Sequence, residues 1–138
     1  MSLMTLLAGI VVVVCGLAFI AFTGVVFARP ALAERFLMSF ASSARAHYVE
    51  MACRLLIGTS LVVLSPAMRP TNMFRVIGWA IVISSVALLL MPWRWHHRFG
   101  RRVLPRLIRW MKVYAVGAFA FGCLLLYGVF FAGSRGAP

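Results

Sequence analysis

Apolar residues occupy four long stretches of the sequence, and shorter polar or basic segments separate them. A helix needs about 20 predominantly apolar residues to cross a hydrocarbon core of about 30 Å. Residues 5–27 meet this requirement, since the first 28 residues contain no charged side chain. This stretch lacks a basic n-region and is longer than the apolar core of a signal peptide, so it is predicted to be a retained membrane helix.

The other three apolar stretches are also predicted to be membrane helices: residues 48–67, 75–93 and 113–132. The second is the least clear, because the uncharged run that follows Arg54 is only 14 residues long. A span of adequate length therefore has to include both Glu50 and Arg54 near its start. A re-entrant hairpin of the second and third stretches, dipping in and out of one leaflet, remains an alternative.

Two connecting segments, residues 31–46 and 94–112, have the pattern of amphipathic helices that lie in the membrane surface. In the second segment, apolar residues at spacings of four form a stripe beside a row of arginines: Trp95, Phe99, Val103, Leu107 and Met111. Gly100 and Pro105 interrupt this pattern, so the segment is expected to form two short helical pieces. The first segment could bend before the second span or continue straight into it through residues 42–43.

The composition agrees with a membrane protein. Hydrophobic residues make up 64% of the 138 residues and charged residues 12%, and the mean hydropathy is +1.01. Such a chain has too little polar surface to cover itself in water. The sequence therefore predicts a single all-α domain of four membrane helices, and it excludes an ordinary soluble domain and a disordered chain.

The formal net charge of +12 is unevenly distributed along the chain. Ten of the 14 basic residues fall in the two connecting segments or directly beside them: Arg29, Arg35, Arg45, Arg94, Arg98, Arg101, Arg102, Arg106, Arg109 and Lys112. Because cytoplasmic loops of membrane proteins are enriched in Lys and Arg, both segments are expected in the cytoplasm. Both termini are then expected on the non-cytoplasmic side of a bacterial-type inner membrane.

Catalytic residues are scarce. The sequence contains no Asp and only two Glu, and no Ser, His or Cys pattern suggests a nucleophile with its base. We therefore predict no enzyme activity, no metal site and no cofactor. A weaker alternative is a haem-bearing electron-transfer subunit that uses His47 and the pair His96 and His97.

The densest candidate binding segment is residues 94–112, whose basic residues are predicted to contact anionic lipid headgroups or an acidic partner protein: Arg94, Arg98, Arg101, Arg102, Arg106, Arg109 and Lys112. The competing interpretation is that these arginines only determine membrane orientation. Nucleic acid is not expected, because the aromatic residues of this segment would be buried in lipid. The favoured function is a non-catalytic accessory or scaffold subunit that packs against other membrane helices or against itself.

Glu50 and Arg54 are spaced four apart and predict an intramembrane ion pair within about one turn of the interface. The alternative function is a small homo-oligomeric transporter or channel subunit. In that case the following polar residues would line its path: Glu50, Thr59, Ser60, Ser84 and Ser85. The hydroxyl pair Thr59 and Ser60 of the second span is expected to meet the pair Ser84 and Ser85 of the third span at a similar depth in the membrane. Small residues are expected at helix contacts: Gly9, Gly16, Gly24, Ala118 and Gly122.

Overall fold

The computed structural model describes residues 2–40 and 43–131 of the chain. This part consists of helices joined by short turns, and it contains no strand: α1 (Leu3–Ala28), α2 (Pro30–Phe40), α3 (Ala44–Leu64), η1 (Ser65–Ala67), α4 (Thr71–Leu90), α5 (Trp93–Arg109) and α6 (Met111–Phe130). Four of these segments are long and apolar enough to cross a membrane: α1, α3 with η1, α4 and α6. The prediction of an all-helical protein with four membrane-length helices is confirmed.

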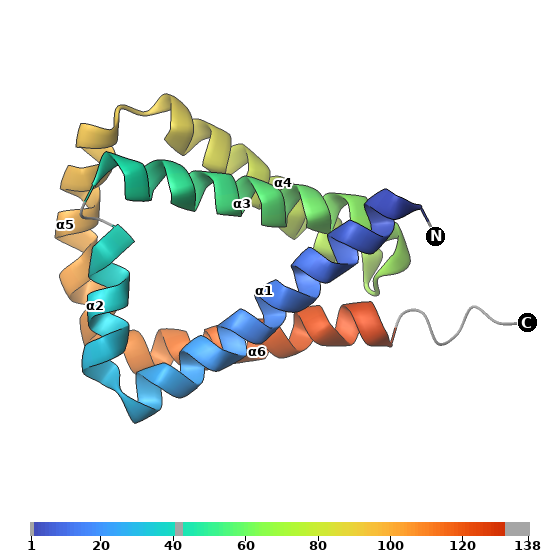
Figure 1. Cartoon of the computed structure of the whole chain (residues 1–138), viewed down its shortest axis with the longest axis horizontal. Helices are drawn as coiled ribbons and strands as arrows, with labels where there is room; N and C mark the ends of the chain where they lie inside the picture. The colour runs from blue at the N-terminus through green and yellow to red at the C-terminus, as the bar shows by residue number, and fades with distance from the viewer. Residues whose placement is uncertain (1, 41–42, 132–138) are drawn as a thin grey trace, which may run out of the picture.

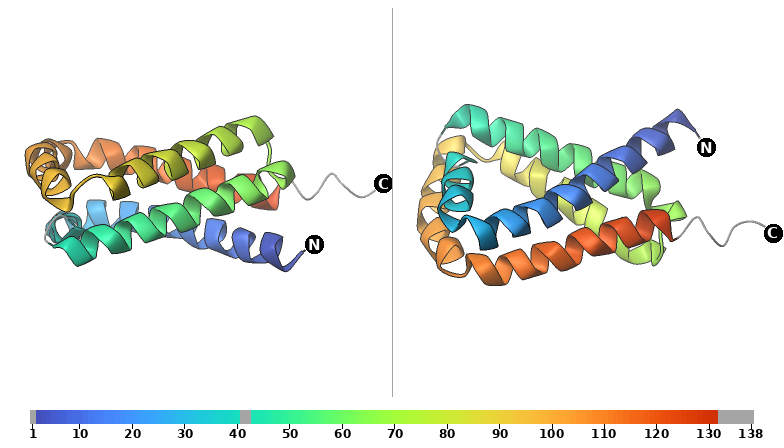
Figure 2. Two further views of the ribbon diagram at one scale, coloured as in Figure 1. Left: turned by 90° about the horizontal axis from the view of Figure 1, so that it is seen from above. Right: turned by 60° about the horizontal axis from the view of Figure 1, so that its bottom comes forward.

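The four long helices form two pairs that meet at one end of the molecule and diverge toward the other (Figure 1). α1 packs along α6, α3 packs along α4, and α1 also crosses α3. The start of α1 and the end of α6 lie near the end where the pairs meet, here called the narrow end (Figure 1). The short helices α2 and α5 lie across the opposite, wide end (Figures 1 and 2).

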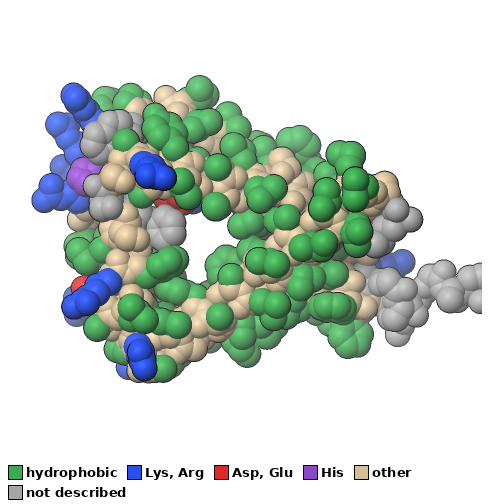
Figure 3. Space-filling model, in the orientation of Figure 1, with side chains coloured by type: hydrophobic (Ala, Val, Ile, Leu, Met, Phe, Trp, Pro, Cys, Tyr) green, Lys and Arg blue, Asp and Glu red, His purple; other side chains and the backbone are tan. Residues whose placement is uncertain are grey.

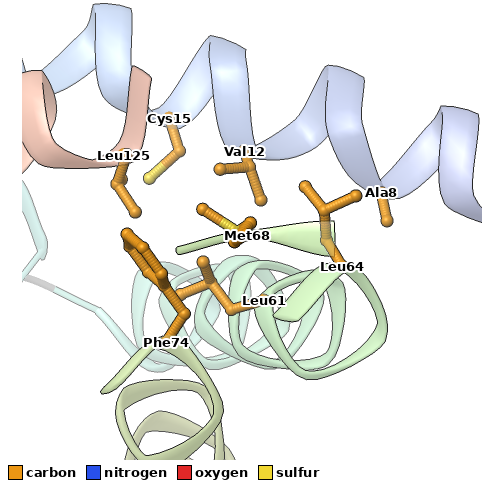
Figure 4. Close-up of a cluster of buried hydrophobic side chains, with 8 residues drawn as sticks. All are labelled: Ala8, Val12, Cys15, Leu61, Leu64, Met68, Phe74 and Leu125. Atoms are coloured by element: carbon orange, nitrogen blue, oxygen red, sulfur yellow. The ribbon is translucent and has the colours of Figure 1, made fainter. Parts of the chain in front are cut away.

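A cluster of buried apolar side chains holds the two pairs together at the narrow end (Figure 4). It draws on all four long helices and on the turn before α4: Ala8, Val12, Cys15, Leu61, Leu64, Met68, Phe74 and Leu125. Phe74 of α4 is completely buried. Its ring lies so near Gly128 of α6 that a Cβ added there would be 2.7 Å from Phe74 Cζ.

Glycines bring the backbones of each pair into contact. A Cβ on Gly122 of α6 would lie 2.7 Å from the carbonyl oxygen of Gly16 in α1. A Cβ on Gly78 of α4 would lie 3.0 Å from the carbonyl oxygen of Gly58 in α3. Close approach at small residues is the usual way in which membrane helices pack.

A second, smaller cluster joins α2 to the α1–α6 pair at the wide end, and it consists of Val26, Ala33, Met111 and Ala115. Next to it, the Thr23 hydroxyl lies 2.9 Å from the carbonyl oxygens of Phe19 in its own helix and Ala115 in α6. No apolar cluster of the described residues joins the two pairs at this end, so they remain apart.

Prolines and one serine determine where the helices begin and end. Pro30 follows the C-cap Arg29 and starts α2, and Pro92 separates α4 from α5. Ser43 has an extended backbone, and its hydroxyl accepts a hydrogen bond from the Ala46 N–H at 3.2 Å. This N-cap starts α3 at Ala44, four residues earlier than predicted, and it makes α2 and α3 separate helices. Residue 42 lies outside the described residues.

Two expectations about the second basic segment were wrong. α5 is one helix that continues through Pro105, since a proline removes one N–H donor while the rest of the helical hydrogen bonding can persist. Met111 does not belong to an exposed stripe, because it begins α6 and is buried in the second cluster. The helix change at Trp110 turns Met111 away from the face of Phe99 and Val103.

Candidate functional site

A polar cluster lies in the otherwise apolar contact between α3 and α4. The Arg54 guanidinium lies 3.5 Å from the Glu50 carboxylate, Nη1 to Oε1. Its Nε donates to the Ser85 hydroxyl at 3.3 Å and its Nη2 to the Ser84 hydroxyl at 3.4 Å. The structure thus brings together four of the residues singled out from the sequence, from two different helices.

The two serines are oriented as acceptors for Arg54. Each donates its own hydroxyl proton to the Ile81 carbonyl oxygen, at 3.0 Å from Ser84 and 2.6 Å from Ser85. The lone pairs of both hydroxyls then remain for the guanidinium, which has only donors. Ser85 is completely buried, so its position is determined by the packing of α4 against α3.

The pair lies deeper in α3 than in the predicted helix of residues 48–67. Because α3 begins at Ala44, Glu50 and Arg54 come six and ten residues after its start. At 1.5 Å per residue, these positions are about 9 and 15 Å along the helix. The N-cap at Ser43 is the cause of this longer helical segment before the pair. The expectation that the pair lies within about one turn of the membrane interface stays a prediction.

The expected meeting of the two hydroxyl pairs does not occur. Gly58 lies opposite Gly78, and this register places Ser84 and Ser85 beside Arg54 instead of Thr59 and Ser60. Thr59 is exposed and donates to the Leu55 carbonyl oxygen of its own helix at 2.7 Å. The five residues proposed from the sequence for a transport path therefore do not lie on one surface.

The ion pair faces the space between the two helix pairs. Arg54 and Glu50 lie on one side of α3. The same side holds Ile57, Leu61 and Leu64 one to three turns further along the helix, where α3 packs against α1. Where α1 has diverged, this side is open, and the Arg54 and Glu50 side chains are 38% and 28% exposed. The space-filling view shows an opening through the molecule, with an acidic side chain visible on the wall formed by α3 and α4 (Figure 3).

The basic residues of the second segment all project outward at the wide end. Every one of the seven is exposed: Arg94, Arg98, Arg101, Arg102, Arg106, Arg109 and Lys112. The first six lie on α5, whereas Lys112 is the second residue of α6. Trp95 and Phe99 of α5 are 66% and 62% exposed, so cationic and aromatic side chains share this surface.

The histidines are placed on different helices. His47 is buried in α3, and His97 is partly exposed on α5, while the side chain of His96 lies outside the described part. Within the described residues, no group of three or more His, Cys, Asp or Glu side chains could hold a metal ion. A haem between the histidines stays a prediction from the sequence.

Comparisons of the chain with protein-family models, with curated proteins and with solved structures found no match.

Proposed function

We propose that the protein is a non-catalytic, multi-pass protein of a bacterial-type inner membrane, with both termini outside the cytoplasm. The wide end, with α2 and α5, then lies at the cytoplasmic surface, where basic side chains gather (Figure 3). Among the described basic residues, only Arg69 in the turn before α4 and Arg75 near the start of α4 lie toward the narrow end.

The proposed role is that of an accessory or scaffold subunit that holds anionic lipid headgroups on α5. The observation that carries this proposal is that every arginine side chain of α5 is exposed beside the exposed side chains of Trp95, Phe99 and Val103. A helix with this surface lies in the headgroup region, its apolar side chains in the acyl boundary and its guanidinium groups among phosphates. Each basic residue near an anionic surface contributes about 1 kcal/mol. An acidic partner protein is the other ligand that this surface would suit.

The test is the lipid that remains bound to the full-length protein after mild detergent extraction. Replacing Arg101, Arg102 and Arg106 by Gln should weaken the binding of anionic lipid about a hundredfold, since three contributions of about 1 kcal/mol are lost. The matched control replaces Arg69 and Arg75 by Gln at the narrow end and should leave retention unchanged. Equal retention of anionic lipid by both variants would show that the arginines of α5 only determine the orientation of the protein in the membrane.

The accessory role has its own readout. The exposed apolar surface of the four long helices can contact other membrane helices as well as lipid. Extraction from native membranes should therefore yield a complex larger than the 15.3 kDa chain. A monomer with no bound lipid or protein would contradict both halves of the proposal.

A further inference from the structure

The opening between the two helix pairs has two chemically different walls. The α3–α4 wall carries Glu50 and Arg54. On α1, the row that begins with Ala8, Val12 and Cys15 continues at helical spacing to Phe19 and Phe22. Phe19 and Phe22 contact Phe121 of α6 and Phe36 of α2, so the α1 side of the opening is apolar while the α3–α4 side is charged.

The polar wall presents a positive and a negative charge 3.5 Å apart. This pair has no net charge, so it provides no general attraction for an anion, in contrast to the surface of α5. It is complementary instead to a group that carries both charges. A phosphate suits the guanidinium, and an ammonium suits the carboxylate.

The guanidinium retains hydrogen-bonding capacity for such a ligand. A guanidinium has five N–H donors. Three of the Arg54 donors reach Glu50, Ser84 and Ser85, and the structure gives no further acceptor for Arg54 within the described residues. Because the two serines hold the group from the α4 side, the remaining donors can serve a phosphate that enters from the opening.

A bilayer supplies the occupant. Little water is present in a hydrocarbon core, so an opening between membrane helices fills with acyl chains or with another helix. The two pairs diverge toward α2 and α5 (Figure 1), and the space-filling view shows the opening between them (Figure 3). A lipid there can place its headgroup against α3 and its chains in the opening between the two helix pairs.

We propose that a phospholipid with a zwitterionic, amine-bearing headgroup binds between the two helix pairs, with its phosphate on Arg54 and its ammonium on Glu50. This site rests on the membrane placement proposed above. It does not depend on anionic lipid binding by α5, and the two sites differ in the lipid that they select.

The test uses native mass spectrometry of the protein after delipidation and exposure to equal amounts of phosphatidylethanolamine and phosphatidylglycerol. The wild type should retain one phosphatidylethanolamine per chain. Glu50→Gln should weaken its binding about tenfold and should raise the binding of phosphatidylglycerol, since Arg54 is then unopposed. Arg54→Gln should lose both lipids from this site.

A headgroup series on the wild type keeps the test independent of variant folding. Successive N-methylation of phosphatidylethanolamine removes the N–H groups that donate hydrogen bonds to Glu50, so the amount of bound lipid should fall at each step. Arg101→Gln with Arg102→Gln is the matched control, because it should lower bound phosphatidylglycerol and leave bound phosphatidylethanolamine unchanged.

Three results would overturn the proposal. They are equal retention of all the headgroups by the wild type, unchanged phosphatidylethanolamine binding in Glu50→Gln, and a lipid-free dimer in which a second copy fills the opening. If only the variant Arg101→Gln with Arg102→Gln lost phosphatidylglycerol, the result would support a separate anionic-lipid site on α5 and would agree with the proposed site on Glu50 and Arg54.

Discussion

Gly58 and Gly78 bring the backbones of α3 and α4 into contact, since a Cβ on Gly78 would lie 3.0 Å from the Gly58 carbonyl oxygen. This contact fixes the register of the two helices. With Gly58 opposite Gly78, the guanidinium of Arg54 reaches Ser84 and Ser85. The position of the candidate site therefore follows from a contact between two residues that have no side chains.

Replacing Gly78 by Ala should destabilise the protein by about 1–3 kcal/mol, the usual cost of overpacking. The added methyl would also lie 3.0 Å from the Val62 backbone nitrogen, which cannot move without shifting α3. The measurement is unfolding in mixed micelles with increasing denaturing detergent. Gly117→Ala is the control, because a Cβ there meets nothing within 4 Å. Similar midpoints for the two variants would show that α3 and α4 are not in backbone contact.

Removing one member of the Glu50–Arg54 pair should cost more than removing both. Glu50→Gln leaves the guanidinium without its counter-charge in a partly enclosed site, and a loss of about 1–2 kcal/mol is expected after allowance for the exposure of both side chains. The double variant Glu50→Gln with Arg54→Gln should recover part of this loss. A double-mutant cycle measures the coupling, and strictly additive effects would mean that the pair does not interact.

Ser85→Ala should destabilise the protein by about 1 kcal/mol, because it removes a buried acceptor of the Arg54 guanidinium. Thr59→Ala is the matched control. Its hydroxyl is exposed and bonds only within α3, so this variant should change stability by a few tenths of a kcal/mol at most. If the two variants lost the same stability, the hydrogen bond between the helices would be unimportant.

The four membrane-length helices could be predicted because their signal is local. Length and apolar content alone identify them, and α1 extends only two residues before and one residue after the predicted 5–27. The predicted start of the second membrane helix at residue 48 is too late, because the connecting segment predicted at 31–46 includes residues that already belong to α3, which begins at Ala44. The N-cap Ser43 was the available signal for the true start.

The candidate site required information that the sequence provides only indirectly. Glu50 and Arg54 follow from a spacing of four, but their partners Ser84 and Ser85 depend on the register of α3 and α4. Gly58 and Gly78 were the signal for that register, since each is a small residue inside a predicted span. Gly16 and Gly122 were correctly expected at helix contacts, whereas Gly9 and Gly24 have open space around them.

In the proposed topology, α2 and α5 lie at the cytoplasmic surface and the narrow end lies outside. This topology is tested most directly by labelling single cysteines with a membrane-impermeant maleimide in intact cells, after Cys15, Cys53 and Cys123 are replaced by Ala. Asn72→Cys at the narrow end should be labelled from outside, and Ser39→Cys on α2 should be labelled only after the membrane is permeabilised. Labelling of Ser39→Cys in intact cells, with Asn72→Cys protected, would contradict the account.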